Sequence, residues 1–206
     1  VLGTGAIAYH QVEGVLAVRP SIDRVILWNR TTKKAHELAA ELKSNLDEGV
    51  AFEVSESAEA AVRAADIVTT CTASPDPVVK GEWVRPGTHV NLTGAHGSDM
   101  REGDDELLRR TSVRSVDMLD AASVSGELKL PIEAGVATRE SFVEIGQILT
   151  GSAPRRTDDD EITWYKSGGI AAQDLTTGKA VYEQARARGL GTDIDLDRSL
   201  ATAQSA

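Results

Sequence analysis

Residues 1–8 read VLGTGAIA, which is typical of a strand that runs into a glycine-rich turn at the start of a helix. In a G-x-G-x-x-G/A turn the first glycine permits the tight bend, the second lets the backbone approach a pyrophosphate, and the third small residue lets helix and strand pack closely. Gly3, Gly5 and Ala8 occupy these positions. The dipole of a helix beginning near Ala6 would favour the phosphates. Alone, the pattern fits a nucleotide site and a plain strand-to-helix turn equally well.

A second apolar run at residues 24–31, RVILWNRT, follows about twenty residues later, where the dinucleotide-binding pattern expects an acidic residue at a strand end. This chain has the neutral Asn29 and the cationic Arg30 there. A carboxylate would repel a ribose 2′-phosphate, whereas an arginine pairs with it through charge-assisted hydrogen bonds. The sequence therefore predicts NADP(H) as the preferred cofactor, with NAD(H) also possible. A merely solvated arginine at a strand end is the alternative.

The chain begins unusually close to its first glycine. A parallel central strand needs about five residues, yet only Val1 and Leu2 precede Gly3. We expect the sequence to be cut in mid-strand, with the true N-terminal part outside these 206 residues.

Composition limits the class of protein. The chain has 206 residues, 41% hydrophobic and 26% charged, with a formal net charge of -10, so we expect a globular, soluble protein whose charge disfavours nucleic acid. The single cysteine, Cys71, cannot form an internal disulfide, which suits the reducing cytoplasm. No apolar run reaches the length of a membrane span, and no leader peptide is visible.

Apolar runs alternate with helical patterns along the chain, which predicts a doubly wound parallel α/β sheet, the Rossmann class. A loosely held acidic tail is expected after residue 191. Strands are predicted at 24–31, 52–54, 66–72, 88–93, 113–117 and 161–166. Helices are predicted at 6–18, from a cap at Thr32 through Leu42, from a cap at Ser55 or Ser57 to about Ala65, and at 104–110, 139–149 and 170–188.

The ends of the predicted strands carry the candidate chemistry, because ligands of doubly wound sheets lie beyond the carboxyl ends. Residues 70–75, TCTASP, would run over the cofactor, with Thr72 offering a hydroxyl and the small Ala73 and Ser74 leaving room for ribose. Cys71 has no activating partner visible in the sequence, so we interpret it as a small buried residue and not a nucleophile.

Two polar clusters follow. The first, residues 94–102, reads GAHGSDMRE after the predicted strand at 88–93 and is the densest in the chain. Within it we interpret Asp99, Arg101 and Glu102 as loop and helix-cap residues. The second, residues 158–161, reads DDDE, and we predict a solvated turn there and no metal site, because consecutive acids rarely converge on one ion.

Several stretches together resemble the ornithine cyclodeaminase/mu-crystallin family, nearer its ketimine reductase and alanine dehydrogenase branch. They occur in order over residues 1–188: GTGAIA, ILWNRT, ADIVTTCTASPDPVVKGEWVRPGTHVNLTGAH, MRE-x-DDELL, EIGQILTG and YKSGGIAAQDL. The resemblance implies a homodimer whose second domain combines an N-terminal segment with the C-terminal helix. It predicts a Rossmann domain over residues 1–168, and a helix and tail over residues 169–206 that return to a largely absent substrate and dimerisation domain.

The resemblance also implies hydride exchange at the Cα of an amino acid or its imine, and it supplies cofactor contacts. Ala6 and Ile7 match the residues against the pyrophosphate, Asn29 the ribose selector, and Ser167 a contact at the nicotinamide end. The predicted cofactor-binding residues are Gly3, Thr4, Gly5, Ala6, Ile7, Asn29, Arg30, Thr31, Thr72, Ala73, Ser74, Asn91, Thr93 and Ser167.

One position departs from the family pattern. Where ornithine cyclodeaminases have a catalytic aspartate this chain has His96, and four residues on it has Met100 in place of a lysine. This argues against ornithine cyclodeamination. A histidine titrates close to neutral pH, so His96 either donates a proton to an imine or orients a carbonyl, as a catalytic residue, or only hydrogen-bonds within its loop.

The function predicted from the sequence is an NADP(H)-dependent oxidoreductase that acts on the C–N bond of an amino acid or its cyclic imine. The alternatives are an amino-acid dehydrogenase of the alanine dehydrogenase type and a non-catalytic, crystallin-like NADPH-binding protein. We expect little or no turnover by these 206 residues alone.

Overall fold

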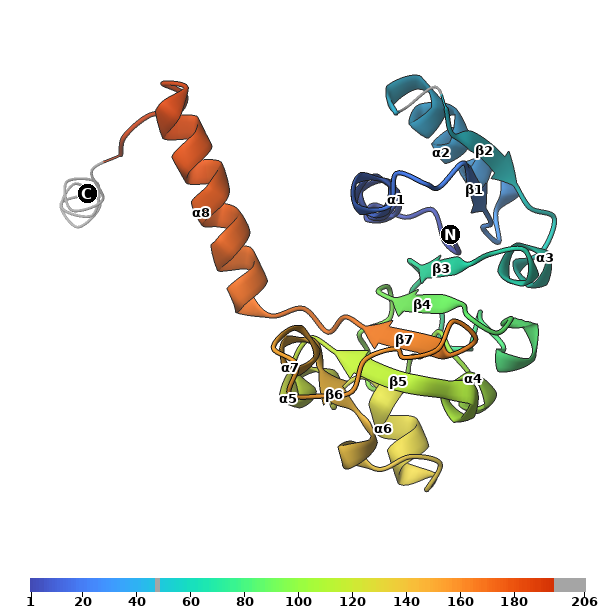
Figure 1. Ribbon diagram of the computed structural model, residues 1–206. Coiled ribbons are helices and arrows are strands. Elements are labelled where there is room, and N and C mark those ends of the chain that lie inside the picture. Colours follow the sequence, from blue (N-terminus) through green and yellow to red (C-terminus); the bar gives the residue numbers. More distant parts are fainter. Residues whose placement is uncertain (47–48, 195–206) are drawn as a thin grey trace, which may run out of the picture. The chain divides into compact units, whose positions relative to one another are not determined.

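The computed structural model of the chain describes residues 1–46 and 49–194. The described chain divides into two compact units, Val1–Gly169 and a second that begins at Ile170 (Figure 1). Each unit is described by itself. Most of the acidic tail that the sequence predicts to be loosely held lies outside the described residues.

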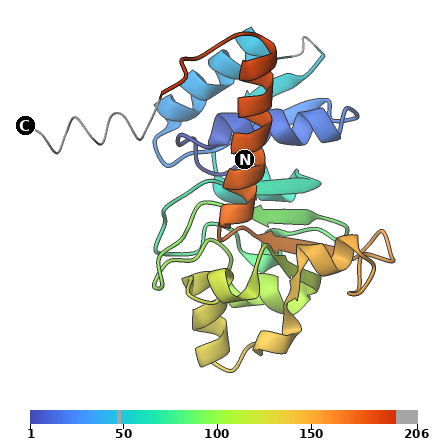
Figure 2. The ribbon, with the colours of Figure 1, turned by 90° about the vertical axis from the view of Figure 1, so that its left-hand side faces the viewer.

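Every strand pairing in the first unit is parallel, and the pairs form sheets of order β1-β2 and β3-β4-β7-β5-β6. Figures 1 and 2 show this order of strands from two directions. The strands are β1 Arg24–Leu27, β2 Ala51–Val54, β3 Ile67–Thr70, β4 His89–Leu92, β5 Thr111–Val116, β6 Val143–Glu144 and β7 Ile162–Lys166.

Leu2 joins the two sheets. It bridges in parallel to Trp28 after β1 and to Thr70 at the end of β3, and its amide donates to the Thr69 carbonyl at 2.8 Å. The strand order therefore reverses at Leu2, which makes the residues that follow it the switch point of a doubly wound sheet. The predicted Rossmann fold is confirmed.

Helices and short 3-10 turns connect the strands. In chain order they are α1 Ala8–Val18, α2 Thr32–Asn45, α3 Ala58–Arg63, η1 Gly81–Trp83, α4 Asp105–Arg110, α5 Leu119–Ala122, α6 Gly126–Glu133, η2 Arg139–Ser141, α7 Ile145–Leu149 and α8 Ala171–Ala187.

Two hydrophobic cores cover the two faces of the sheet, as the alternation along β1 shows. Val25 and Leu27 pack with α1 and α2 in one core, whereas Ile26 and Trp28 pack against the other core, which contains Val62 of α3. Successive residues of a strand point to opposite faces, so a continuous apolar run is what a sheet covered on both sides requires.

Two expectations about helices need correction. Thr32 is not a cap but the first residue of α2, and Thr31 stands at the cap position without a side-chain bond to the helix. The predicted helix at 139–149 is instead η2, the short strand β6 and α7, because Val143 and Glu144 pair with β5. The helices α5 and α6 are not among the predicted elements.

Two predicted helix starts are confirmed. The Ser57 hydroxyl oxygen accepts from the Ala60 amide at 3.0 Å and caps α3, and Asp104 caps α4 by accepting from the Leu107 amide at 2.8 Å. Such caps satisfy amides that have no partner within the helix.

The second unit consists, in its described part, of α8 and the turn that follows it up to residue 194. It starts after Gly169, whose φ of 79° lies in the left-handed region that favours glycine. The helix predicted at 170–188 is confirmed. Of the helices in residues 1–46 and 49–194, none combines the length and the apolar composition that a membrane-spanning helix needs.

Candidate functional site

Five loops meet at the carboxyl edge of the parallel sheet. They follow Leu2, β1, β3, β4 and β7, and because parallel strands end at the same edge, the loops come together there. The loops are residues 3–7, 29–31, 71–75, 93–97 and 167–169. These five loops contain almost all of the site residues predicted from the sequence.

The glycine-rich turn is pressed against the loop after β3. Gly3 has a φ of 89°, and a Cβ there would lie 2.7 Å from the Cys71 carbonyl oxygen and from Thr72 Cγ2. A side chain at this position is therefore excluded both by the backbone conformation and by contact. Ala8, the third small residue of the motif, is fully buried where α1 packs on the sheet.

The outer part of the turn presents donors that the protein itself does not use. Gly5, Ala6 and Ile7 are exposed, and within the described chain their amide N–H groups donate to no protein acceptor. The Thr4 hydroxyl is buried and likewise has no partner among the described residues. Adjacent free amides at the start of a helix are the arrangement that binds phosphate, so the turn fits a dinucleotide.

Asn29 connects the loop after β1 to this turn. Its Oδ1 accepts from the Thr4 amide at 3.3 Å, and its Nδ2 donates to the Thr31 carbonyl at 3.0 Å. Arg30 and Thr31 are exposed, and Arg30 has no ion-pair partner in the described part of the chain. A cation without an internal partner thus stands beside the turn that has free amides.

An open groove of about 540 Å³ runs along the turn between α1 and α2. Thr4, Gly5 and Ala6 border it on one side, and Lys34 and Glu37 of α2 on the other. A second cavity, of about 440 Å³, is lined by Val1, Asp23–Ile26 and Asp66–Ile67 among others. It lies towards the amino ends of β1 and β3 and contains no predicted site residue.

Thr72 is hydrogen-bonded to the buried Glu102, and its hydroxyl is not free. Its amide and its Oγ1 both donate to Glu102 Oε1, at 2.8 and 2.7 Å, while its Oγ1 accepts from the Ser74 amide at 3.4 Å. Ala73 is exposed and Ser74 half-buried. The adjoining Cys71 is buried, and burial raises the pKa of its thiol to about 11, which opposes thiolate chemistry at neutral pH.

Asn91 and Thr93 contact the sheet. The Asn91 side chain bonds to His89 at 3.0 Å and to Thr69 at 3.4 Å, on the face of β4 and within the strand. The Thr93 hydroxyl is buried and donates to the Thr70 carbonyl at 2.6 Å. Both side chains are therefore hydrogen-bonded to residues of β3 or β4.

His96 is exposed on the loop after β4. Two residues before it, Gly94 fits against the loop after β3 so closely that a Cβ would lie 2.2 Å from the Thr72 amide nitrogen and carbonyl oxygen. The loops after β3 and β4 are thus in direct backbone contact at Gly94, two residues before His96.

A buried charged cluster, formed by Glu102, Glu127 and Lys166, lies beneath these loops. All three side chains are buried, Glu102 and Lys166 completely. Burial raises the pKa of Glu127 to about 7, although backbone hydrogen bonds and Lys166 oppose the shift. Burial likewise lowers the pKa of the Lys166 amine, which the three neighbouring carboxylates Glu127, Glu102 and Asp117 partly restore.

Asp117, at the carboxyl end of β5, holds the loop after β7. Its Oδ2 accepts from the Gly168 and Gly169 amides at 2.7 and 2.6 Å and from the Ser167 hydroxyl at 3.3 Å. Ser167, which the family resemblance assigns to the nicotinamide end, is therefore fixed by a buried carboxylate.

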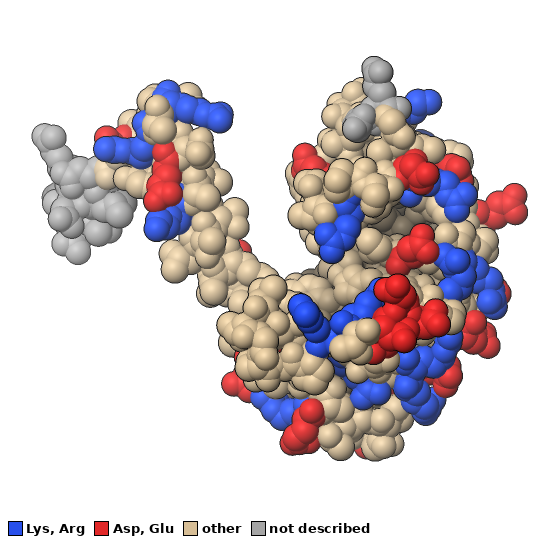
Figure 3. All heavy atoms as spheres, viewed as in Figure 1, with Lys and Arg blue, Asp and Glu red and all other residues tan. Residues whose placement is uncertain are grey.

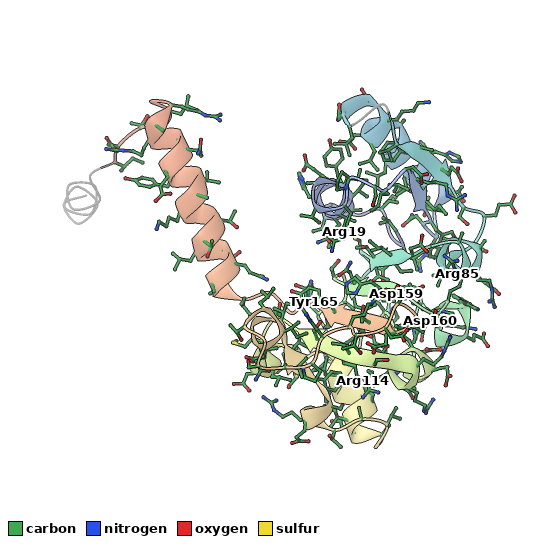
Figure 4. All side chains as sticks on the ribbon, viewed as in Figure 1. Arg19, Arg85, Arg114, Asp159, Asp160 and Tyr165 are labelled. Carbon is green, nitrogen blue, oxygen red and sulfur yellow. The ribbon has the colours of Figure 1, made fainter. Side chains whose placement is uncertain are left out.

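The acidic run at residues 158–161 is far from this edge. Residues 158–160 form an exposed turn just before β7, and the Gly87 amide donates to the Asp160 carbonyl at 2.8 Å. Asp159 and Asp160 therefore mark the amino ends of β7 and β4 (Figure 4), on a face where acidic and basic side chains alternate (Figure 3). The described residues include no cluster of three or more metal-ligating side chains.

Sequence reasoning missed the buried charged cluster. From the sequence alone we interpret Glu102 as a loop or cap residue, and no motif singles out Glu127. A signal existed for Lys166, which ends the otherwise uncharged run ITWYK after Glu161. Charged residues are almost never fully buried unless paired, so a lysine closing a buried strand indicates a partner elsewhere in the chain.

The parallel sheet, the switch point and the phosphate-binding turn define the class: a Rossmann domain of the dinucleotide-binding type. Comparison with known families narrows this. The profile of the ornithine cyclodeaminase/mu-crystallin family matches residues 1–189, and the chain belongs to that family, as its motifs predicted.

Three relatives represent the branch. Mouse ketimine reductase mu-crystallin is 35% identical over 184 residues, covering 89% of this chain and 54% of that protein. The solved Thermococcus litoralis Delta(1)-pyrroline-2-carboxylate reductase, in complex with NADH and L-proline, has a TM-score of 0.88 and 34% identity, over 94% of this chain and 59% of that one. An archaeal alanine dehydrogenase dimer with bound NAD has a TM-score of 0.86 and 35% identity, over 95% and 59%. The chain thus spans little more than half the length of these relatives.

Proposed function

We propose that the protein is an NADP(H)-dependent oxidoreductase that acts by hydride transfer on the C–N bond of an amino acid or of its cyclic imine. One observation carries the proposal. The turn with three free amides at residues 5–7 occurs in a chain that superimposes, with a TM-score of 0.88, on a pyrroline-carboxylate reductase solved with NADH and L-proline. Two of the three relatives are named as imine reductases and the third as an amino-acid dehydrogenase.

The preference for NADP(H) rests on Arg30. The solved relatives hold NADH and NAD, so this preference is inferred from this chain and not from theirs. Asn29 replaces the acidic residue that would repel a 2′-phosphate, and the exposed Arg30 has no ion-pair partner in the described residues. A guanidinium next to the ribose favours the phosphorylated cofactor.

The roles of the residues follow from their places at the edge. The amides of residues 5–7 would bind the pyrophosphate, while the exposed Ala73 and the loop of Ser167 would border the ribose and nicotinamide. When bound, the nicotinamide supplies the hydride. His96, exposed on the loop after β4, would hold the proton that the imine nitrogen takes up. The protein otherwise contributes binding and orientation.

The proposal is tested by NADPH oxidation with the intact gene product, scanned over cyclic imino acids and over pyruvate with ammonia, with NADH run alongside. We expect turnover with a cyclic imine and a preference for NADPH. Turnover only with pyruvate and ammonia would establish the alanine dehydrogenase alternative, which is kept because a solved alanine dehydrogenase is 35% identical to this chain. Saturable NADPH binding without turnover would instead establish a crystallin-like binding protein.

The role of His96 has its own test. His96→Asn should lower kcat at least about tenfold, since a positioned proton donor contributes that much or more, with the Kd for NADPH unchanged. The control is His36→Asn, on the exposed side of α2. An unchanged kcat in His96→Asn would show that His96 is a loop residue without a catalytic role.

We also propose that the whole protein is a homodimer that binds a small amino or imino acid. The archaeal alanine dehydrogenase was solved as a dimer, and the relatives are longer than this chain. Light scattering on the intact gene product gives the mass directly, and a monomer would contradict the proposal.

A further inference from the structure

Glu102 is bonded to two loops at once. Its Oε1 accepts from the Thr72 amide at 2.8 Å and the Thr72 hydroxyl at 2.7 Å. Its Oε2 accepts from the Gly94 amide at 2.7 Å and the Ala95 amide at 3.1 Å. One fully buried carboxylate therefore closes four hydrogen bonds to the loops that follow β3 and β4.

Glu127 fixes the backbone of Glu102 in turn. The Glu102 amide donates to Glu127 Oε2 at 2.8 Å, and the Gly103 amide to Glu127 Oε1 at 3.0 Å. Glu127 lies in α6, an element far along the chain from both loops. The backbone of Glu102 is therefore bonded to α6, while its side chain is bonded to the two loops.

Lys166 completes the arrangement from the other side. Its Nζ donates to the Ala95 carbonyl at 2.5 Å, while the Ala95 amide donates to Glu102. Ala95 is thus held at both its amide nitrogen and its carbonyl oxygen by buried charged groups, and the next residue in the chain is His96. The direction in which His96 leaves the sheet is set by this double attachment.

The chemistry of the side chain matters here. Four donors converge on Glu102, and a carboxylate, with two oxygens and about four lone-pair sites, can accept from all of them. A glutamine has one acceptor oxygen and two donors, so its amide group would face backbone N–H groups. If the only role of this side chain were to fill space, an apolar residue would be more favourable, because burying a charge is costly unless it is fully hydrogen-bonded.

We infer that Glu102 is a positioning residue for the reaction: it sets the loop of Thr72 against the cofactor and, through Ala95, sets His96 against the substrate. What these loops bind rests on the proposed function. That Glu102 sets their geometry does not, because it follows from the hydrogen bonds themselves.

The experiment compares Glu102→Gln and Glu102→Asp with two controls in the intact gene product. Glu106→Gln removes an exposed carboxylate of α4, which controls for charge. Val84→Ala makes a cavity at a buried site before β4, which controls for lost stability. All are measured well below their melting temperatures, with circular dichroism as the check that each is folded.

Two readouts are taken. Hydrogen exchange by NMR reports the amides of Thr72, Gly94 and Ala95, which should lose protection in Glu102→Gln and keep it in both controls. Fluorescence titration gives the Kd for NADPH, which should rise at least about tenfold in Glu102→Gln, the loss expected when bonds to a charged group are removed. Glu102→Asp, which keeps the charge on a shorter side chain, should fall between. In steady-state kinetics, kcat should fall in Glu102→Gln as well.

The outcomes separate the two proposals. A folded Glu102→Gln with NADPH binding and kcat like the wild type would overturn the positioning role, as would a Val84→Ala that weakens NADPH equally. If Glu102→Gln fails to fold, Glu102→Asp decides the same question. A wild-type protein that binds neither NADPH nor NADH would overturn the proposed function, and the amide protection of Thr72, Gly94 and Ala95 would still decide the role of Glu102.

Discussion

On one side of the carboxyl edge, two hydrogen bonds join the glycine-rich turn to the segment after β1, one from the Gly3 amide to the Trp28 carbonyl at 2.8 Å and one from the Thr4 amide to Asn29 Oδ1 at 3.3 Å. On the other side, the loops after β3 and β4 share four hydrogen bonds to Glu102, of which the longest is 3.1 Å. The outer part of the turn, residues 5–7, keeps its amides free in the described chain, whereas the Thr72, Gly94 and Ala95 amides of the loops donate to Glu102. The turn is therefore suited to bind an anion from outside, and the loops are suited to present a fixed shape.

The largest effect is expected where the loops meet. Gly94→Ala places a Cβ 2.2 Å from the Thr72 backbone, so the two loops must separate, and the free energy of unfolding should fall by about 3 kcal/mol or more. Chemical denaturation measures it. The matched glycine is Gly14, which lies within α1 with nothing within 4 Å of its added Cβ. Gly14→Ala should raise stability by about 0.5 to 1 kcal/mol, and similar losses in both variants would refute the contact.

The buried Glu127, which lies beneath the loops, should make the free energy of unfolding depend on pH. Burial raises the pKa of Glu127 from 4.5 to about 7, so between these values the folded protein holds a proton that the unfolded chain releases. The free energy of unfolding should therefore fall as pH rises from about 4.5 to about 7, by about 1 to 3 kcal/mol on account of this group. The measurement is the difference between wild type and Glu127→Gln across that range. A difference that stays constant would contradict it.

A smaller effect, on binding, is expected on the side of the turn. Arg30→Ala should weaken NADPH about tenfold and leave NADH within about twofold, because only NADPH carries the 2′-phosphate that a guanidinium pairs with. Fluorescence titrations with both nucleotides measure this. Arg24→Ala, at the opposite end of β1 where Arg24 stands 3.9 Å from Glu53, is the control. Equal losses of affinity for both nucleotides would show that Arg30 does not pair with the 2′-phosphate.

The smallest effect is expected at the link between turn and strand. Asn29→Ala removes the 3.3 Å bond from the Thr4 amide, and we expect a loss of only about 0.5 kcal/mol in the free energy of unfolding, the low end for an uncharged hydrogen bond. A loss as large as that of Gly94→Ala would show that the turn is as firmly held as the loops, and the contrast between the two sides would then fail.

The sequence predicted the side of the turn better than the side of the loops. Gly3 and the run RVILWNRT are local signals. A glycine indicates a position with positive φ, here 89° at Gly3, and a continuous apolar run indicates a buried parallel strand. The partners of Glu102 come from segments that only the fold brings together, with Thr72 thirty positions away. Nothing in the spacing of residues 94–102 distinguishes a buried carboxylate from a solvated one.

The prediction of one helix at 139–149 is wrong for a similar reason. Its apolar residues have helical spacing, but Val143 pairs with Ser115 of β5 and Phe142 is buried against Trp164, with ring centroids 5.4 Å apart. Tertiary pairing outweighed local propensity there. Similarly, α6 contains Pro131, which local rules exclude from a helix interior.

The strand made last in the first unit lies in the middle of its sheet. β7 pairs with β4 on one side and with β5 on the other, so until residues 162–166 leave the ribosome the nascent chain has two incomplete half-sheets with open edges. Such edges can pair with other chains, and contacts between segments distant in sequence form slowly. Folding of this sheet during synthesis must therefore wait until nearly the whole of the first unit has been made.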